Sequence, residues 1–222
     1  MRTLMRFLIV LAVPVVLIVA GIRAVTLPWF PTWEYARPGF PADPYGMPPT
    51  ERLALAHTCI AFLNLPHDTA LLAALRLPDG SPAFNARELS HMDDVKEVYD
   101  RVTTWAAFAL VVAAAAAWAL HLHGDHASIW GGLSNGGLLT LLLFLVLGLL
   151  MVLAWRSFFV GLHGVFFEGD SWLFEYFDTL IRLFPERFWQ DAGLLIAGAV
   201  SAVAFALAFV GRVIQRRLEG AV

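Results

Sequence analysis

Four long apolar runs divide the chain, with polar or mixed sequence between them. A helix needs about 20 mostly apolar residues to cross a bilayer, and each run comes close to that length. Pro14 and Arg23 interrupt the first run, whereas the third contains no charged residue. The pattern therefore predicts four membrane-spanning helices, at about residues 7–25, 105–122, 129–155 and 192–211.

The first run follows the basic sequence MRTLMR, as the apolar core of a secretory signal would. It is long, however, and we find no convincing small-x-small cleavage motif after it. We therefore expect a retained anchor.

Arginine placement predicts the orientation of the spans. Basic residues near membrane spans favour the cytoplasmic side, and they gather at both ends of the chain: Arg2, Arg6, Arg212, Arg216 and Arg217. We expect both termini in the cytoplasm. Two larger segments, about 27–104 and 157–191, then face outward.

The first outward segment is expected to contain two helices. Residues 27–49 are rich in proline and aromatic residues, which predicts irregular chain at the membrane interface. Thr50 is then expected to N-cap a helix with apolar positions at helical spacing. A second helix, ARELSHMDDVKEVYDR, is expected to run into the second span.

The second outward segment begins after Arg156 and is dense in aromatic residues, which favour the headgroup zone of a membrane. It predicts a helix over 172–184, ended by Pro185, with Asp178 and Arg182 as a surface pair one turn apart. The fold class predicted is an all-α membrane protein, with interfacial helices between spans 1–2 and 3–4. A single membrane domain over 1–222 accounts for the pattern.

Composition agrees with this setting. Of 222 residues, 59% are hydrophobic and 15% charged, and the net charge of −3 argues against a nucleic-acid binder. The single cysteine, Cys59, excludes an intramolecular disulfide and a cysteine-based zinc site. It lies on an apolar helical face, so we interpret it as a packing residue.

Two histidines stand out because both fall in outward segments. His91 lies in the helix before span two, with Glu88 and Asp94 about one turn away and able to orient its ring. His163 follows span three, and Glu168 and Asp170 come soon after it. Taken singly, each is an ordinary interfacial residue; taken together, they are a candidate pair.

Two segments then resemble a known family. NARELSHMDDVKEVYDR followed by a span, and FFVGLHGVFF…SWLFEYFDTLIRLFPERFWQDA leading into the last span, look like the lipoprotein intramolecular transacylases. The resemblance implies a four-span protein of the bacterial cytoplasmic membrane. It also implies an outward-facing catalytic histidine pair, which by motif falls on His91 and His163.

The resemblance further implies the reaction and its partners. The substrate would be a diacylated bacterial lipoprotein in the membrane lipid, and the sn-2 acyl chain would move from glycerol oxygen to the α-amine of the N-terminal cysteine. The product is the lyso N-acyl S-monoacylglyceryl form. Imidazole, with a pKa of roughly 6.5, suits the proton transfers of this reaction, one ring as base and another as acid.

No cofactor or metal is needed for such a transfer. The sequence has no cysteine placed as a nucleophile. Donor ester and acceptor amine lie on one molecule, so positioning supplies much of the catalysis. Some group must still stabilise the developing oxyanion; the possible donors are Asn85, Trp172, Arg182 and Arg187.

Other interpretations stay open. His121, His123 and His126 resemble a metal-binding cluster in the predicted cytoplasmic loop, and His91 and His163 with nearby acids could ligate zinc. A non-enzymatic membrane assembly or partner-binding protein is the competing class. A catalytic pair would require the rings of His91 and His163 to lie within about 10 Å of each other.

Overall fold

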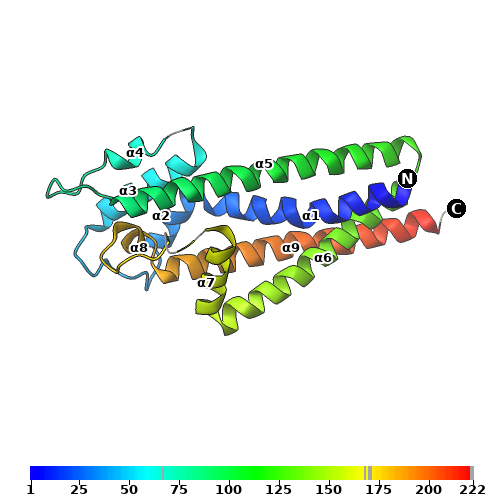
Figure 1. The fold of residues 1–222 in the computed structure, drawn as a ribbon. Coiled ribbons are helices and arrows are strands. Elements are labelled where there is room, and N and C mark those ends of the chain that lie inside the picture. The colour runs from blue at the N-terminus through cyan, green and yellow to red at the C-terminus, as the bar shows by residue number, and fades with distance from the viewer. Residues whose placement is uncertain (67, 168, 170–171, 221–222) are drawn as a thin grey trace. The chain divides into compact units, whose positions relative to one another are not determined.

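The computed structural model describes residues 1–66, 68–167, 169 and 172–220. Its secondary structure in this part of the chain is helical apart from turns and an isolated β-bridge between Arg76 and Pro82. Figure 1 follows the helices along the chain: α1 (Arg2–Val25), α2 (Trp29–Tyr35), α3 (Pro49–Asn64), α4 (Ala70–Ala73), α5 (Ala86–Leu122), α6 (His126–Leu153), α7 (Trp155–Phe166), α8 (Thr179–Leu183) and α9 (Glu186–Glu219).

The chain groups into two compact units. The first unit comprises residues 1–22, 102–155 and 194–222, and the second comprises 23–101 and 156–193. The first unit thus holds the apolar parts of four helices, and the second holds the segments that the sequence predicts to face outward. A single domain over 1–222 stays a prediction.

Four helices of the described chain are long and apolar enough to cross a membrane: α1, α5, α6 and α9. This confirms the predicted all-α membrane fold. The third span, α6, begins slightly before the predicted residue 129. The Asp125 side chain caps this helix by accepting a hydrogen bond from the Ser128 amide at 3.1 Å. It ends at Leu153, where Ala154 leaves helical geometry with φ −147° and ψ 51°.

Glycines let the helices of the first unit approach closely. A Cβ added at Gly136 of α6 would lie 2.6 Å from the Val13 Cβ of α1, and one at Gly137 would lie 2.5 Å from the Ala204 carbonyl oxygen of α9. Small residues at such contacts are typical of membrane helices, whose association depends on van der Waals packing. The apolar sequence of α6 therefore carries a specific packing face.

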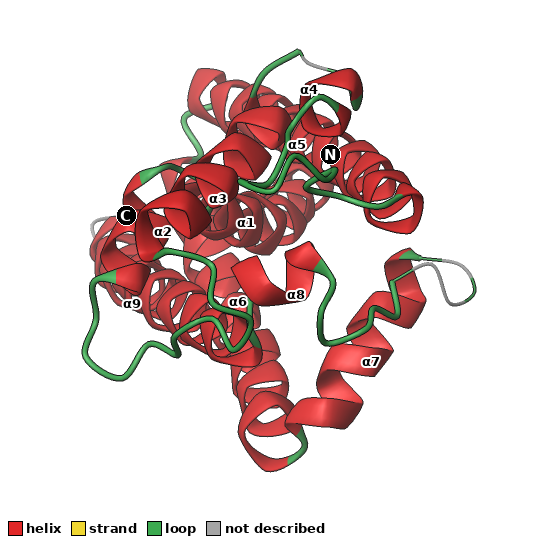
Figure 2. Ribbon diagram, turned by 90° about the vertical axis from the view of Figure 1, so that its left-hand side faces the viewer, coloured by secondary structure: helices red, strands yellow, loops and turns green. Residues whose placement is uncertain are grey.

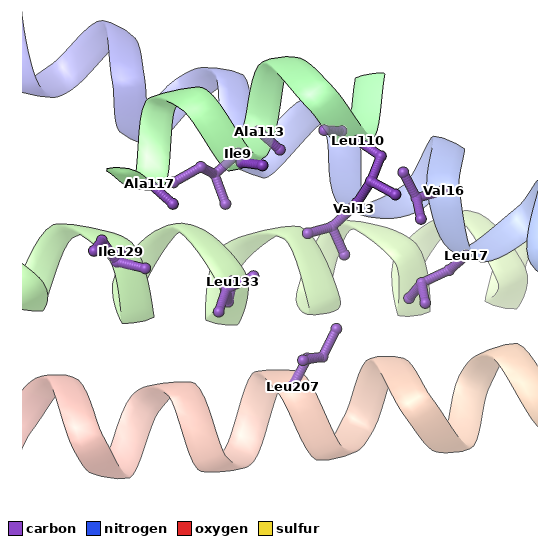
Figure 3. A pocket seen from close by; sticks show the side chains of 12 residues that line it. Ile9, Val13, Val16, Leu17, Leu110, Ala113, Ala117, Ile129, Leu133 and Leu207 are labelled. Atoms are coloured by element: carbon purple, nitrogen blue, oxygen red, sulfur yellow. The ribbon is translucent and has the colours of Figure 1, made fainter. Parts of the chain in front are cut away.

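The first unit also contains an apolar cavity of about 280 Å³. Figure 3 shows side chains of α1, α5, α6 and α9 that line it, among them Val13, Leu110, Leu133 and Leu207. Every residue that lines it is Ala, Val, Leu or Ile. The cavity therefore offers shape and apolar surface, but no group for acid–base chemistry.

The core of the second unit lies among α3, α4, α5 and α8. It includes Cys59 and Phe62 of α3, Leu72 of α4, Met92 of α5 and Leu183 of α8. Cys59 is a free thiol, 1% exposed, and burial raises its pKa well above the ordinary value. This confirms its interpretation as a packing residue.

Two predictions near the start of the second unit were wrong. The stretch 27–49 is not wholly irregular: it forms α2, which buries Phe30 and Glu34 and carries Pro31 in its first turn, where proline is tolerated. The next helix begins at Pro49 and has Pro48, not Thr50, as its N-cap. A proline at the first helical position has its φ already set for the helix, so α3 starts two residues earlier than predicted.

The helix predicted over 172–184 was also wrong in its first half. Residues 172–178 are not helical, and the helix that follows them, α8, is only Thr179–Leu183 (Figure 2). Asp178 is extended, with φ −63° and ψ 140°, and its carboxylate accepts a hydrogen bond from the Glu175 amide at 2.8 Å. That local bond favours a turn over a helix.

Candidate active site

A capping box sets the start of α5. The Asn85 side-chain oxygen accepts hydrogen bonds from the amides of Arg87 and Glu88, both at 3.0 Å. The Glu88 carboxylate returns the bond by accepting from the Asn85 amide at 2.8 Å. This reciprocal arrangement satisfies amides that the first turn leaves unpaired, and it places His91 one turn further along a well-defined helix. The N-x-x-E spacing was readable in the sequence and was missed.

The same residues join α5 to the loop before α8. The second Glu88 oxygen accepts from the Leu180 amide at 2.7 Å. Asp178 accepts from the Asn85 side-chain amide at 2.8 Å and forms an ion pair with Arg87 at 3.2 Å. Glu88 and Asp178 are 2% and 4% exposed. They are therefore buried connections that fix the wall beside His91.

Glu88 thus acts on the backbone and not on the His91 ring. Burial raises its pKa, and its backbone hydrogen bonds oppose that shift. In the described part of the chain, Nδ1 of His91 is buried without a hydrogen-bond partner. The expectation that Glu88 or Asp94 orients the His91 ring is therefore not met at Nδ1.

His163 is oriented by its own helix. Its Nδ1 lies 2.8 Å from the Phe159 carbonyl oxygen, one turn earlier in α7. Because a carbonyl oxygen only accepts, Nδ1 must carry the proton. The neutral ring then has its lone pair on Nε2, which is the nitrogen able to act as a base.

The structure brings the two histidines together. Their ring centroids are 6.4 Å apart and their planes differ by 19°, which meets the distance expected of a pair. Phe167 contacts both rings, at 4.9 Å from His91 and 5.6 Å from His163. Phe174 lies 5.2 Å from His91, and Trp172 lies 4.8 Å from His163. The pair therefore has aromatic walls.

Both histidines are electrostatically suited to be neutral. Burial, and then the neighbouring His163, lower the pKa of His91 to about 4. Burial also lowers the pKa of His163, against the effect of its hydrogen bond to Phe159. Desolvation disfavours a charged imidazole, so both rings are neutral near pH 7.

Of the four oxyanion donors named from the sequence, Trp172 contacts a histidine ring. Arg182 instead forms two hydrogen bonds of 3.0 Å with Asp43, so its predicted surface pairing with Asp178 was wrong. Arg187 pairs with Asp191 at 2.5 Å. The Asn85 side-chain amide donates a hydrogen bond to Asp178.

Among the described residues, no group of three histidine, cysteine or acidic side chains is arranged to hold a metal. In the predicted loop cluster, the His121 ring lies 5.0 Å from His126 and stacks on Trp118. Asp125, the acid of that loop, caps α6. Glu168 and Asp170 lie outside the described residues.

Comparison with known proteins then decides the family. The family model of the lipoprotein intramolecular transacylase Lit matches residues 7–189. The chain belongs to the Lit family. The predicted enzyme class, an acyltransferase that carries out intramolecular transfer on lipoproteins, is thereby confirmed.

Relatives of this Lit family member cover its whole length. It is 31% identical to an uncharacterized protein of Aquifex aeolicus (strain VF5), over 99% of each chain. Its fold is similar to the in meso structure of the membrane integral lipoprotein intramolecular transacylase Lit from Bacillus cereus, with a TM-score of 0.82, 19% identity and coverage of 99% and 98% of the two chains. A structure of that protein with a histidine-to-arginine mutation gives a TM-score of 0.72 at 17% identity, over 100% of this chain and 95% of the other.

Proposed function

We propose that His91 and His163 are the catalytic pair with which this Lit family member moves the sn-2 acyl chain of a diacylated lipoprotein to the α-amine of its N-terminal cysteine. The observation that carries this proposal is the pair of imidazoles, His91 buried and His163 half-buried, 6.4 Å apart within aromatic walls. Aromatic side chains suit the lipid part of such a substrate, and two neutral imidazoles suit its proton transfers.

His163 is the base in this proposal. The lipoprotein amine, with a pKa of about 7.7–8.0, attacks the ester carbonyl carbon in its neutral form. The new C–N bond leaves a positive charge on nitrogen, and Nε2 of His163 removes a proton from it. The resulting imidazolium keeps its Nδ1–H bond to the Phe159 carbonyl, which favours the charged ring at the moment it forms.

The same proton then completes the transfer. The C–O bond to glycerol breaks, and the departing oxygen takes the proton from His163. His91, whose pKa is about 4, is neutral at this stage. It therefore serves as a hydrogen-bond donor to the glycerol oxygen and not as a cationic acid, as neutral imidazoles can. This assigns the two roles that the sequence left open.

Positioning supplies much of the remaining rate. Holding two reacting groups of one molecule in contact is worth roughly 7–11 kcal/mol in favourable cases. The proposal therefore needs no covalent enzyme intermediate. Cys59, the single cysteine, is buried in the core of the second unit and takes no part.

The orientation is part of the same proposal. The arginines near both termini favour the cytoplasmic side, so the second unit, with the histidine pair, would face outward in the bacterial cytoplasmic membrane. None of the twelve residues of α7 is buried, and its apolar side includes Leu162 and Phe166. Such a helix is suited to lie in the lipid interface, where diacylated lipoproteins are found.

The test is expression in a bacterium whose lipoproteins are diacylated with a free amine. The mass of the modified N-terminal peptide stays the same, so fragmentation must locate the acyl chain on an amide instead of a glycerol ester. His91→Ala and His163→Ala should each lower the transfer rate by at least about 10²-fold. His57→Ala, in α3, is the matched control.

A competing function is a non-enzymatic assembly or partner-binding protein. It predicts that the wild-type chain leaves both esters in place, and that the two histidine variants resemble wild type in every assay. Either result, with the protein inserted in the membrane, contradicts the catalytic-pair proposal.

A further inference from the structure

Two buried polar atoms without a partner lie on the rings that flank His163. In the described part of the chain, buried side-chain atoms of this kind are His91 Nδ1, Thr103 Oγ1, Trp172 Nε1 and Gln215 Oε1. Thr103 and Gln215 belong to the first unit, whereas His91 and Trp172 belong to the second. Buried polar groups are nearly always hydrogen-bonded. Two exceptions beside one ring therefore indicate a polar ligand that reaches both.

Trp172 restricts what that ligand can be. An indole N–H donates one hydrogen bond, accepts none and does not titrate near neutral pH. The Trp172 ring lies 4.8 Å from the His163 ring with 36° between their planes. The N–H lies in the plane of the indole, so its partner approaches along the edge of the indole ring. That partner must present an acceptor oxygen.

We propose that Trp172 Nε1–H is a catalytic hydrogen-bond donor to the carbonyl oxygen of the transferred acyl ester. This inference rests on the proposed function of the histidine pair. When the amine nitrogen bonds to the carbonyl carbon, the π electron pair of C=O moves to oxygen, and Trp172 stabilises the negative charge there. No proton leaves the indole.

In the second half of the transfer, the electron pair on the carbonyl oxygen returns to form the C=O bond again. When the C–O bond to glycerol breaks, its electron pair leaves with the glycerol oxygen, which takes the proton that His163 removed from the amine. The pair on the carbonyl oxygen re-forms C=O as an amide. A donor that is stronger toward an oxyanion than toward a carbonyl lowers the barrier selectively.

The other donors named from the sequence are already occupied. The Arg182 guanidinium is held by Asp43, the Arg187 guanidinium by Asp191, and the Asn85 amide by Asp178. Each of these side chains is therefore directed toward an acid that is itself buried. Trp172 Nε1 has no such bond in the described chain.

Trp172→Phe is the first test, because it keeps an aromatic ring against His163 and removes the N–H. Removing one oxyanion donor typically lowers kcat by about 10²–10³-fold. We expect that loss in kcat, with KM changed by less than about threefold, since the ground-state carbonyl gains less from the bond. The pH profile should keep the wild-type shape because the titrating groups remain.

A second variant separates the N–H from the shape of the ring. Site-specific replacement of Trp172 by 3-benzothienylalanine exchanges N–H for sulfur at nearly constant size. It should lose as much kcat as Trp172→Phe. Trp189→Phe is the matched control: its ring is 44% exposed and contacts Phe184 and Phe188, so wild-type activity is expected.

The outcomes distinguish this inference from the function on which it rests. Wild-type kcat in the benzothienyl variant, or a loss that appears in KM alone, overturns the donor role of Trp172. If the wild-type chain is active and His163→Ala inactive, that failure leaves the histidine pair standing. An inactive wild-type chain, or an active His163→Ala variant, rejects the pair and the donor together.

Discussion

The Glu88 carboxylate accepts a hydrogen bond from the Leu180 amide at 2.7 Å, across 92 positions of sequence. Its other oxygen accepts from the Asn85 amide. One buried side chain thus holds the first turn of α5 against the start of α8. His91 follows Glu88 by one turn of α5, and Phe174 lies in the loop that leads to α8. This bond therefore sets the spacing between His91 and Phe174 of its aromatic wall.

Glu88→Ala should therefore lower both stability and activity. It leaves the buried Leu180 amide unpaired, at a cost of about 1–3 kcal/mol, and it removes the carboxylate that caps the Asn85 amide. We expect a lower Tm in detergent and a lower transfer rate per folded molecule, with an unchanged pH profile. Glu97→Gln, an exposed residue paired with Arg101, should change neither by a measurable amount. Wild-type Tm in Glu88→Ala would contradict the bracing role.

Local patterns in the sequence were enough to predict the spans and the histidine pair. The apolar runs located four spans, and the position of His91 and His163 in outward segments selected the pair that lies 6.4 Å apart. The capping box of Asn85 and Glu88 is equally local, because three positions of sequence separate its two residues.

Partner choice between distant segments was not predictable in this way. Asp178 and Arg182 are one turn apart, which made a surface pair the natural prediction. Each finds its partner far away in the sequence: Arg87 lies 91 positions from Asp178, and Asp43 lies 139 positions from Arg182. Tertiary packing decides such pairs, and no local spacing encodes it.

The Asp43–Arg182 pair should contribute to stability and not to catalysis. Arg182 donates two hydrogen bonds of 3.0 Å to Asp43, whose side chain is 1% exposed. Arg182→Ala leaves a buried carboxylate without its cation, which typically costs about 3–5 kcal/mol. Asp43 also accepts amide bonds from Tyr45 and Met47, so Asp43→Ala should cost a similar amount.

The double variant separates these two contributions. Asp43→Ala with Arg182→Ala should be less destabilised than the sum of the single variants, since the residues share an interaction. Chemical denaturation measures the cycle, and kcat at saturating substrate should stay near wild type for the fraction that remains folded. A selective loss of kcat in Arg182→Ala would return this residue to the list of oxyanion donors.

Helix packing in the first unit gives a prediction with an internal control. Gly137 of α6 has no room for a side chain, because an added Cβ would lie 2.5 Å from the Ala204 carbonyl oxygen, whereas an added Cβ at Gly148 meets nothing within 4 Å. Gly137→Ala should force α6 and α9 apart and lower Tm in detergent. Gly148→Ala, in the same helix, should leave Tm unchanged or raise it, since alanine favours the helix by about 1 kcal/mol. Equal effects of the two substitutions would contradict the packing.

The pH dependence of transfer should contain two titrations. The rate is proportional to the neutral fraction of the lipoprotein amine and to the neutral fraction of His163. Below an amine pKa of about 7.7–8.0, the logarithm of the rate should fall with a slope near 1 per pH unit. Burial holds the pKa of His163 below its ordinary value of 6.5, so a second fall, to a slope near 2, should begin only under pH 6.5. A profile without that second fall, with chemistry rate-limiting, would exclude His163 as the base.

Stability should respond to the same depressed pKa values. His91 has a folded-state pKa of about 4, against 6.5 as the ordinary value. A group whose pKa is lower in the folded protein does not reduce the free energy of unfolding at pH values above its pKa in the unfolded chain. It removes stability as the pH falls from 6.5 toward 4, because the unfolded chain binds the proton first. At pH 5 this amounts to about 2 kcal/mol.

Wild-type Tm in detergent should therefore fall between pH 7 and pH 5, and His91→Gln should lose much of that dependence. His57→Gln, at a histidine that bonds Thr32 on the exposed side of α3, should retain it. If His91→Gln keeps the full pH dependence of wild type, the ring is not held neutral by its surroundings, and the assignment of His91 as a neutral donor fails with it.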